Sequence, residues 1–335
     1  MGASFNRRPS RIRRTIGALA LTGALVATAL PLDGGAEAVA NTVRADRTIA
    51  DAELVLKPAL DGDRIVYVRR DDSIHAVWLK DLNTGATRKL SDDDSFGAYA
   101  PDIHGNRVVW EETFRRGSVI ALHDLETGET RALTLGPHDY APSLWGDTLI
   151  WTRERHFNAW LMLMDLRTEE TVTLVRVSCG TTSDLFEHTV VYCSGGDIYT
   201  IDLRSGEHRV LIESPQYAEF PALYGDVLAY AQWDDVLSRI HLLNMRTGDT
   251  VVAASAPGCV YAPALSHDRL AWEEYTRPAS TEIKVARTPA GFTSEEVVAS
   301  SGWLANVGYV VRDGLGRLMR LIGSVHAVSI VVLVG

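Results

Sequence analysis

Seven side chains of this sequence have the types and spacing to form a ligand site. Four are tyrosines and three are charged residues, and most of them recur about every 42 residues at matching places of a repeated phrase. They are Tyr99, Tyr140, Tyr217, Tyr261, Glu111, Arg153 and Glu273. An aromatic face with a polar tip, set beside charges, suits a sugar or a peptide. We therefore predict ligand contacts at these residues. The plainer alternative is that the tyrosines pack between repeats and the charges are solvated loop ends.

Motifs for catalysis or for metal binding are missing from the sequence. The ten histidines are scattered, with no His-Glu-x-x-His motif and no Cys-His cluster. The run Asp92-Asp93-Asp94 lacks the alternating ligand spacing of a calcium loop. No Gly-x-Ser-x-Gly elbow or phosphate loop is present. Glutamate pairs begin at Glu111 and Glu273, but they recur with the repeat, so repetition explains them before acid–base chemistry does. We predict no catalytic residue, no metal and no cofactor.

The three cysteines are Cys179, Cys193 and Cys259. A disulfide is expected only in an oxidising compartment, which the leader described below implies. We predict the pairing Cys179–Cys193, because both residues should lie near the same rim of one repeat. A Cys179–Cys259 pair and three free thiols are the alternatives, and one cysteine is left over in any pairing.

One repeated phrase builds the elements that must position these residues. It reads Tyr-Ala-Pro, then apolar residues around a Gly-Asp or Gly-Asn turn, and closes on a Trp or Tyr. Full copies cover residues 99–110, 140–151 and 261–272, and shorter copies cover 58–67 and 221–230. A period between 20 and 50 residues indicates a solenoid, a propeller or an array. A Gly-Asp turn flanked by β-branched residues predicts a hairpin.

A second turn, Asp-Leu-x-Thr-Gly, follows the closing aromatic by about 14 residues. It begins at Asp81, Asp124 and Asp202, and in the copy after Asp165 a glutamate, Glu169, replaces the glycine. Short runs rich in Val, Ile, Leu and aromatics separate the turns and favour strands. Four short antiparallel strands in each repeat make one propeller blade. The predicted fold class is therefore all-β, a β-propeller of four-stranded antiparallel blades.

Seven blades are favoured over six, because the mature length divided by seven matches the repeat length. We expect a degenerate seventh copy with strands near 308–313, 316–321 and 327–334, and a strand from residues 42–56 that closes the ring. The predicted repeats lie near 57–97, 98–138, 139–178, 179–216, 217–258, 259–300 and, in degenerate form, 301–335.

The first 40 residues are typical of a secretory signal peptide. An arginine-rich head precedes the apolar stretch 16–32, and small residues offer cleavage near Ala38 or Ala40. The pair Arg13-Arg14 leaves twin-arginine and general export both open. We expect residues 1–40 to be removed, residues 41–335 to form one propeller domain, and the mature protein to be secreted or held in the cell envelope.

Charge and hydropathy narrow the classes of partner. The formal net charge is −10, and removal of the arginine-rich leader makes it more negative. Nucleic acids and anionic lipids attract clustered Lys and Arg, so we expect neither as a partner. The apolar C-terminal run 327–335 is about half as long as a membrane span, so we expect no span in the mature chain.

The Tyr-Ala-Pro phrase, together with its two turns, resembles the TolB-like (WD-repeat-like) β-propeller repeats of secreted bacterial proteins, over roughly residues 57–300. The resemblance implies binding where the loops before the first strands and those between second and third strands meet at the channel mouth. Such repeats occur in translocation components, surface proteins, peptidase propellers and a few polysaccharide lyases, whose metal is held by several histidines. The Tol-system protein carries an α/β domain ahead of its propeller, and residues 41–56 are too few to form one.

These observations favour a non-catalytic propeller that acts as a binding or scaffold module at the cell envelope, with a protein, peptide or glycan as partner at its mouth. The alternative is a carbohydrate-active enzyme, a polysaccharide lyase or a glycosidase, with its site at the channel mouth. A lyase of this kind requires at least two or three histidines to converge. A propeller that partners a peptidase is a third hypothesis.

Overall fold

A computed structural model describes most of the chain after residue 46. The described residues are 47–52, 55–71, 74–92, 95–136, 138–214, 216–233, 237–256, 259–277, 280–289 and 292, together with the strands 309–312, 318–324 and 327–331. The predicted leader and its cleavage sites lie outside them. Within these residues no helix is long and apolar enough to cross a membrane.

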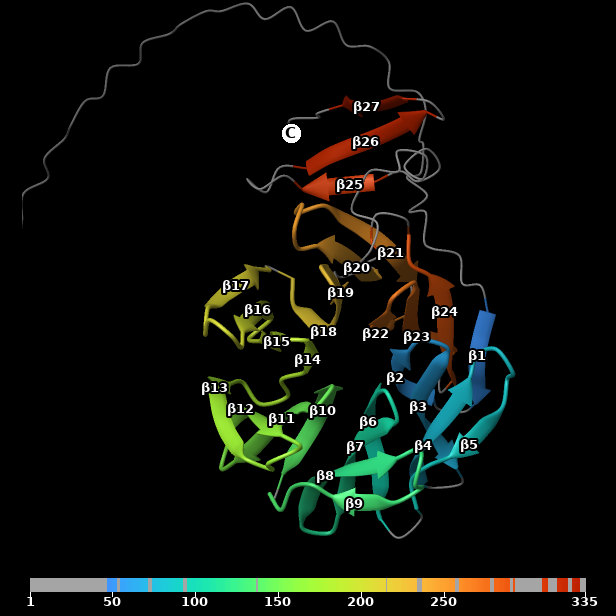
Figure 1. Ribbon diagram of the computed structural model, residues 1–335. Coiled ribbons are helices and arrows are strands. Elements are labelled where there is room, and N and C mark those ends of the chain that lie inside the picture. The colour runs from blue at the N-terminus through green and yellow to red at the C-terminus, as the bar shows by residue number, and fades with distance from the viewer. Residues whose placement is uncertain are drawn as a thin grey trace, which may run out of the picture. The chain divides into compact units, whose positions relative to one another are not determined.

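Six four-stranded antiparallel sheets surround a common centre (Figure 1), and their strands follow the repeat. Blade one contains β2 (Val55–Asp61), β3 (Arg64–Asp71), β4 (Ile74–Asp81) and β5 (Thr87–Lys89). Blade two contains β6 (Gly97–His104), β7 (Arg107–Phe114), β8 (Gly117–Asp124) and β9 (Thr130–Ala132). Blade three contains β10 (Asp139–Trp145), β11 (Thr148–Arg155), β12 (Asn158–Asp165) and β13 (Thr171–Val177).

The second half of the ring repeats this order. Blade four contains β14 (Ser183–Phe186), β15 (Thr189–Ser194), β16 (Asp197–Asp202) and β17 (His208–Ile212). Blade five contains β18 (Ala218–Tyr224), β19 (Val227–Trp233), β20 (Ser238–Asn244) and β21 (Thr250–Ala256). Blade six contains β22 (Val260–Ser266), β23 (Arg269–Arg277), β24 (Ser280–Arg287) and, as its fourth strand, β1 (Arg47–Ala52).

The closing strand was predicted correctly, and the number of blades was not. β1 pairs antiparallel with β24, as expected for residues 42–56. Blade one then packs directly on blade six through a shared apolar cluster that includes Leu60 and Ile283. The ring therefore closes at six blades, and the prediction of seven is wrong. Strands do form in the seventh copy, but β25 (Tyr309–Arg312), β26 (Leu318–Ser324) and β27 (Ala327–Val331) make a three-stranded sheet of their own.

Each interface between neighbouring blades has its own apolar cluster. Six clusters account for the six interfaces, and each draws buried residues from two consecutive sheets. The aromatic that closes the second strand of each repeat is buried in every blade. These residues are Tyr67, Trp110, Trp151, Tyr192, Tyr230 and Trp272. Their recurrence in the sequence is thus a signature of packing between blades.

The Tyr-Ala-Pro phrase produces a β-bulge in the innermost strand. The residue before the proline has a positive φ in five blades, as at Ala100 (45°) and Ala141 (49°), and the strand register shifts there. Such a bulge turns a side chain out of the regular alternation. Blade four has Ser183 in place of the proline, and its register runs without a shift. The sequence break at blade four is therefore a missing bulge.

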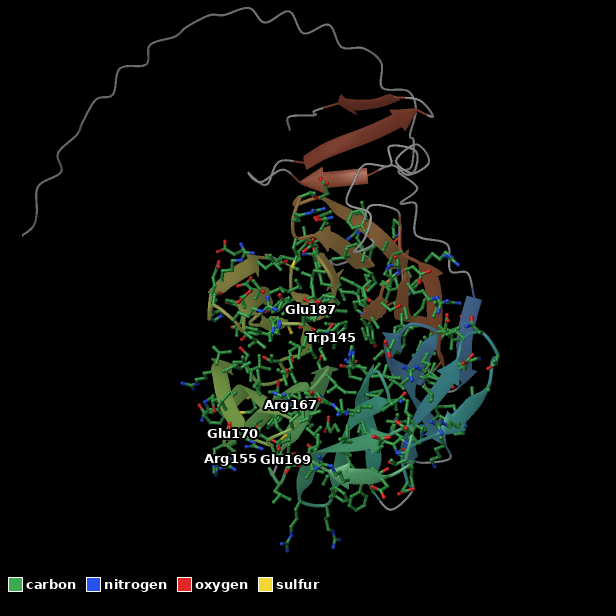
Figure 2. All side chains as sticks on the ribbon, in the orientation of Figure 1. Trp145, Arg155, Arg167, Glu169, Glu170 and Glu187 are labelled. Carbon is green, nitrogen blue, oxygen red and sulfur yellow. The ribbon has the colours of Figure 1, made fainter. Side chains whose placement is uncertain are left out.

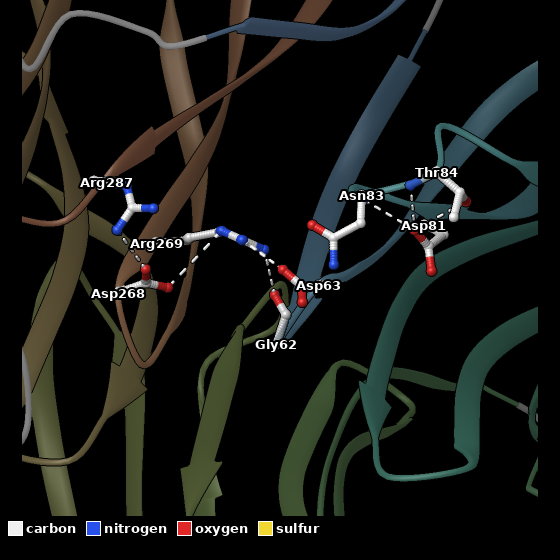
Figure 3. Close-up of polar contacts among 8 residues, drawn as sticks. All are labelled: Gly62, Asp63, Asp81, Asn83, Thr84, Asp268, Arg269 and Arg287. Carbon is white, nitrogen blue, oxygen red and sulfur yellow. Dashed lines mark hydrogen bonds and ion pairs between the residues drawn. The ribbon is translucent and has the colours of Figure 1, made fainter.

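The Asp-x-x-Thr-Gly phrase is a capped turn. The Asp81 carboxylate accepts hydrogen bonds from the N–H groups of Asn83 (2.9 Å) and Thr84 (2.7 Å), as Figure 3 shows. The glycine that ends the phrase has a φ of 75° at Gly85. Glu169 adopts the same conformation in blade three, with a φ of 57°. A side chain there is strained, because only glycine enters this region at no steric cost.

Hydroxyl groups on the third strands fasten each of three blades to the next. In blade six, the Thr281 hydroxyl accepts a hydrogen bond from the Val55 N–H (2.7 Å) and donates one to the Val55 carbonyl (2.8 Å). In blade five, the Ser238 hydroxyl likewise donates to the Val260 carbonyl of blade six and accepts from its N–H. In blade two, the Ser118 hydroxyl donates to the Asp139 carbonyl of blade three. On the opposite edge, Arg269 reaches from blade six to Asp63 (2.5 Å) and to the Gly62 carbonyl (2.9 Å) of blade one (Figure 3).

Thr281→Val should destabilise the closed ring. It removes both hydrogen bonds to Val55 and leaves two buried backbone groups unpaired, which costs about 1–3 kcal/mol for a group of this kind. Urea unfolding measures the change in the free energy of unfolding. Thr171→Val, at an exposed site on β13, is the control, with an expected change within about 0.5 kcal/mol. Equal effects of the two substitutions would contradict the role of Thr281.

Glu169→Gly should stabilise the protein by about 0.5 kcal/mol, because it relieves the positive φ. The substitution also removes the ion pair with Arg131 (2.8 Å), which is exposed on both sides and contributes little. Glu170→Gly, one residue later and outside the positive-φ region, should give no gain. Thermal unfolding compares the two variants, and an equal gain from both would argue against strain at Glu169.

Candidate functional site

The innermost strands of all six blades line one central channel. Its walls come from five consecutive residues in most blades, such as 57–61 in blade one and 100–104 in blade two. The cavity volume of this channel is about 130 Å³. We call the end where the first strands begin the mouth face, because it carries Tyr99, Tyr140 and Tyr261. The opposite end, where the Gly-Asp turns lie, is the turn face.

Three of the four predicted tyrosines sit at matching positions on the mouth face and contact a neighbouring blade. The Tyr99 hydroxyl lies 2.9 Å from Nδ1 of His75 in blade one. The Tyr140 hydroxyl accepts a hydrogen bond from the N–H of Gly180 (2.9 Å), just ahead of blade four. The Tyr261 ring stacks on Phe220 of blade five, with centroids 5.9 Å apart. Each ring thus packs between blades and keeps part of its surface exposed.

Tyr217 and Arg153 occupy different settings from those expected of a shared site. Tyr217 lies in the loop before β18, two residues before the equivalent position, which is Glu219, and is 61% exposed. Arg153 holds the buried Asp139 in a two-pronged ion pair (2.7 and 2.8 Å). This bond to Asp139 raises the pKa of the guanidinium. Gly136 leaves room for the Asp139 carboxylate, which a Cβ at that position would meet at 2.3 Å. Arg153 is thus committed to the start of blade three.

Glu111 and Glu273 are equivalent residues in blades two and six; Glu111 is half-buried and Glu273 is buried. Burial raises the pKa of each carboxyl to about 7. Glu273 is fully buried. Its Oε1 accepts a hydrogen bond from the backbone N–H of Lys57, while Oε2 has no partner among the described residues. A buried carboxyl oxygen without a partner is costly, and such groups mark sites of function more often than of stability.

Lys57 sits beside Glu273 at the bulge of blade one. Its φ is 51°, and it lines the channel. The Nζ atom lies 3.7 Å from the centre of the Phe220 ring, so the side chain reaches from blade one to blade five across the mouth. Phe220 occupies the same bulge position in its own blade, with a φ of 52°. A cation and an aromatic ring replace the alanines found at the bulges of blades two, three and six.

Two carboxyl groups and a serine form a hydrogen-bonded network in the channel wall. Asp102 of blade two accepts the N–H of Leu144 in blade three (2.6 Å). Asp184 of blade four accepts the N–H of Leu223 in blade five (2.6 Å) and the hydroxyl of Ser143 (2.7 Å). Burial raises the pKa of both aspartates, and the charge of Asp184 raises that of Asp102 further. The network fastens four consecutive blades at the channel.

Aromatic rings from three neighbouring blades pack together at the turn face. Trp145 lies 4.2 Å from Phe186 and 6.0 Å from Tyr224, measured between ring centres. His104 adds a fourth ring, 4.2 Å from Trp145. Figure 2 places Trp145 toward the middle of the ring, whereas Glu169 lies at its outer edge. The channel thus has three alanines, Lys57 and Phe220 near the mouth, and a cluster of rings at the turn face.

Neither a disulfide nor a metal site is formed by the described residues. Cys179 and Cys259 are exposed, Cys193 is buried, and all three are free, so the predicted Cys179–Cys193 bridge is not formed. The Cys193 thiol instead lies 3.2 Å from the Thr182 hydroxyl. In the same part of the chain no three His, Cys, Asp or Glu side chains come close enough to hold a metal ion. The histidine cluster that a propeller lyase requires is therefore not assembled there.

Sequence reasoning missed Lys57 and Phe220. Both stand directly before the proline of their repeat, where three other copies have alanine. An alignment of the repeats that starts at the proline does not include the residue before it. A departure from alanine at the residue before each proline is the signal that would have found them.

Comparisons with known proteins show which solved structures share this fold. No protein-family model matches the chain, and no curated protein matches it in sequence. Among solved structures, putative TolB from Agrobacterium tumefaciens aligns with a TM-score of 0.55 and 14% identity, over 72% of this chain and 94% of that one. TolB from Acinetobacter baumannii aligns with a TM-score of 0.53 and 17% identity, over 68% of this chain. The fold is that of the TolB-like propellers.

The TolB-like likeness extends to the fold and no further, because the identities are low. The chain spans 65% of the length of the Acinetobacter baumannii protein. An oligogalacturonate lyase in complex with manganese aligns less well, with a TM-score of 0.49 and 12% identity. The TolB-like neighbours have six blades, in agreement with the ring described above.

The free energy of unfolding should fall as the pH rises from about 4.5 to about 7. Burial raises the pKa of Asp102, Asp184, Glu111 and Glu273, so the folded state holds protons that the unfolded chain has already released. Their stabilising effect is complete below the ordinary carboxyl pKa and is lost as the pH passes the raised values. Urea unfolding at pH 5 and pH 7.5 measures the slope.

Asp102→Asn should make this slope shallower, because the amide oxygen still accepts a backbone N–H but does not titrate. Glu126→Gln, at an exposed residue of the β8–β9 turn, serves as the control and should leave the slope unchanged. A slope unaffected by Asp102→Asn would show that this carboxyl is not among the groups responsible.

Proposed function

We propose that this chain is a non-catalytic binding module of the cell envelope, and that it docks a protein or peptide partner on the mouth face. The observation that carries the proposal is the distribution of exposed apolar side chains. Eight large ones are exposed among the described residues, and six lie on loops or strand ends of the mouth face. These six are Phe96, Phe114, Leu135, Phe157, Tyr217 and Trp233.

The exposed apolar groups are concentrated over blades two and three. Phe114 ends β7, Leu135 lies in the loop between the two blades, and Phe157 lies in the turn between β11 and β12. Leu135 is 96% exposed and Phe157 is 93% exposed. Large apolar groups gathered on one face of a soluble protein indicate an interaction surface. Phenylalanine is also among the residues enriched at protein interfaces.

The turn that presents Phe157 is strained. His156 and Phe157 both have a positive φ, 50° and 63°. A two-residue hairpin turn of this kind favours Asn-Gly, because most side chains clash there. The Phe157 side chain is almost fully exposed, so burial of its ring does not offset this cost. Strain of this type is retained where the side chain has a use.

Arginines accompany these aromatic residues and suggest the charge of the partner. Arg115 and Arg116 follow Phe114, and Arg155 precedes the strained turn. All three are exposed, and no ion pair to a described residue involves them. The whole chain has a net charge of −10, so this group is a local reversal of sign. A partner segment with acidic and apolar residues fits it.

An envelope location agrees with the predicted leader and with the TolB-like fold. Export of residues 41–335 would place the propeller outside the cytoplasm, as one domain after removal of residues 1–40. A carbohydrate-active enzyme with its site at the mouth is not favoured, because Glu273 is buried, Glu111 is half-buried and Arg153 is bound to Asp139. A glycan remains an outcome of the binding test below.

His156→Asn/Phe157→Gly should raise the stability of the protein and weaken partner binding. The new residues suit the turn and should add about 1 kcal/mol. Loss of an exposed aromatic anchor should weaken binding about tenfold or more. Peptide and glycan arrays probed with residues 41–335 identify binders, and titration calorimetry compares the variant with the wild type.

Val172→Thr, at an exposed residue of the outer strand β13 in the same blade, is the matched control and should leave binding unchanged. Binders that keep their full affinity for the double variant would place the interface elsewhere. Binding to glycans alone, with no loss in the variant, would overturn the proposal of a protein partner.

A further inference from the structure

We infer that the turn-face end of the channel binds a small organic cation, an alkylated ammonium ion, between aromatic rings and two aspartates. This site goes beyond the proposed docking function, because it lies at the opposite end of the channel from the mouth face. Three features point to it: the order of side chains along the innermost strands, the rings that meet at the turn face, and the charge of the channel wall.

The innermost strands place side chains in two successive layers along the channel. Asp102, Ser143 and Asp184 line it in blades two, three and four, and the other three blades have alanine at this position. Residues two apart on a strand point to the same side and lie about 7 Å apart along it. The second layer therefore stands directly beyond the first, nearer the turn face. Its members in blades two to five all carry rings: His104, Trp145, Phe186 and Tyr224.

The four rings form a continuous arc around the turn-face end of the channel. Trp145 lies 4.2 Å from both His104 and Phe186, measured between ring centres, and Phe186 lies 4.8 Å from Tyr224. Neighbouring planes are tilted by 44° to 59°, so the rings do not stack flat on one another. Each ring is only half-buried, and His104, Trp145 and Tyr224 line the cavity. Tilted rings around a cavity are the arrangement that receives alkylated ammonium groups.

The charge of the channel wall decides the sign of the ligand. The carboxyl groups of Asp102 and Asp184 are fixed by the N–H donors of Leu144 and Leu223, each 2.6 Å away, and Asp184 also accepts the Ser143 hydroxyl. Burial raises the pKa of both aspartates, and no neighbouring cation offsets this effect among the described residues. A carboxylate withdrawn from water without a counter-ion is costly, and a bound cation removes that cost.

The mouth end of the same channel already shows this chemistry within the chain. There the Lys57 ammonium lies over the Phe220 ring, 3.7 Å from its centre. The negative charges of Glu273 and Glu219 act on the same ammonium. A ring and nearby acids thus hold an alkyl ammonium group at the mouth, and that group is the chain's own lysine.

The cations near the turn face are engaged elsewhere. Arg64 pairs with Asp61 (2.6 Å) and Arg107 pairs with Asp147 (2.7 Å). Neither arginine is among the described residues that line the cavity. Burial lowers the pKa of His104, so its ring is uncharged near neutral pH and does not compete with a cation. The cation that fits the rings and aspartates must therefore come from outside the described chain.

Choline and its uncharged isostere, 3,3-dimethylbutan-1-ol, test the inference on the protein. Titration calorimetry at pH 8, above the pKa of about 7 for Asp102 and about 6 for Asp184, should give a dissociation constant of about 1 mM or below for choline. The alcohol has the same shape without the charge and should bind about tenfold or more weakly. The N-methyl proton resonance of choline should shift upfield, because the bound ion lies over ring faces. Equal affinities for the two ligands, or no binding of choline, would overturn the inference.

Two ring variants locate the site. Trp145→Leu removes the central ring and keeps apolar bulk, so choline binding should weaken about tenfold or more. Trp160→Leu, on β12 of the same blade and outside the cavity lining, is the matched control and should leave the affinity unchanged. Tyr224→Leu removes the ring at the end of the arc and gives a second test if thermal unfolding shows that Trp145→Leu does not fold. Equal affinities in the ring variants and in Trp160→Leu would contradict a site among these rings.

Removal of charge tests the aspartates separately from the rings. Asp102→Asn/Asp184→Asn keeps the oxygens that accept backbone N–H groups of the next blades and removes both charges. Choline binding should weaken about tenfold or more, whereas binding of the alcohol should not change. Glu187→Gln/Asp226→Asn removes two exposed charges of the turn face outside the cavity and should leave both affinities unchanged. An equal loss of choline affinity in the two double variants would show that only the net charge of this face matters, and would overturn the inference.

Discussion

Every blade of this propeller is covered on both faces only because two neighbours press against it. The six apolar clusters each belong to two consecutive sheets, and none of them lies within a single blade. A blade on its own would expose both faces to water, and a sheet of a few short strands needs packing on at least one face to be stable. The ring must therefore close, and the interface between blade six and blade one is as necessary for stability as the other five interfaces. Bulges, turns and hydroxyl groups all act at these interfaces.

The repeat made the blade predictable and hid the features that differ from it. The hairpins, the capped turn at Asp81 and the buried aromatic at Trp110 follow directly from local chemistry, so a sequence suffices for them. The number of blades does not follow, because strands in 309–331 look like a further copy and only the packing of Leu60 on Ile283 shows that the ring is already closed. A non-local contact of this kind leaves no local signal.

The candidate site shows the same division. Tyr99, Tyr140 and Tyr261 lie on one face, since their position in the repeat fixes it. Tyr217 matches them in residue type and not in register, because Glu219 occupies the equivalent position before Phe220 and Pro221. Arg153 was expected to face a ligand and instead binds Asp139, an acid 14 residues earlier whose carboxylate fits only because Gly136 lacks a side chain. The spacing of the repeat predicts the backbone position of a residue, whereas the direction of its side chain depends on a partner elsewhere in the fold.

The departures from the repeat lie on the channel and on the mouth face. Lys57 and Phe220 replace alanine at two bulges, Asp102 and Asp184 introduce charge into the channel wall, and Phe157 occupies a turn that favours glycine. Asp102 and Asp184 link neighbouring blades through hydrogen bonds that an alanine could not make. These five residues come from five different blades, so each of those blades departs from the common repeat in its own way.

The closing strand has a mechanical consequence. β1 forms strand hydrogen bonds along one edge only, with β24. The two strands lie more than 200 positions apart in the sequence. The ring cannot close until almost the whole propeller has been synthesised, because β24 is the strand that β1 pairs with. A force that peels β1 from β24 would open blade six first, because β1 is the fourth strand of that blade. The first strand of the described residues is thus the last to meet its partner during synthesis and the first to be lost under such a force.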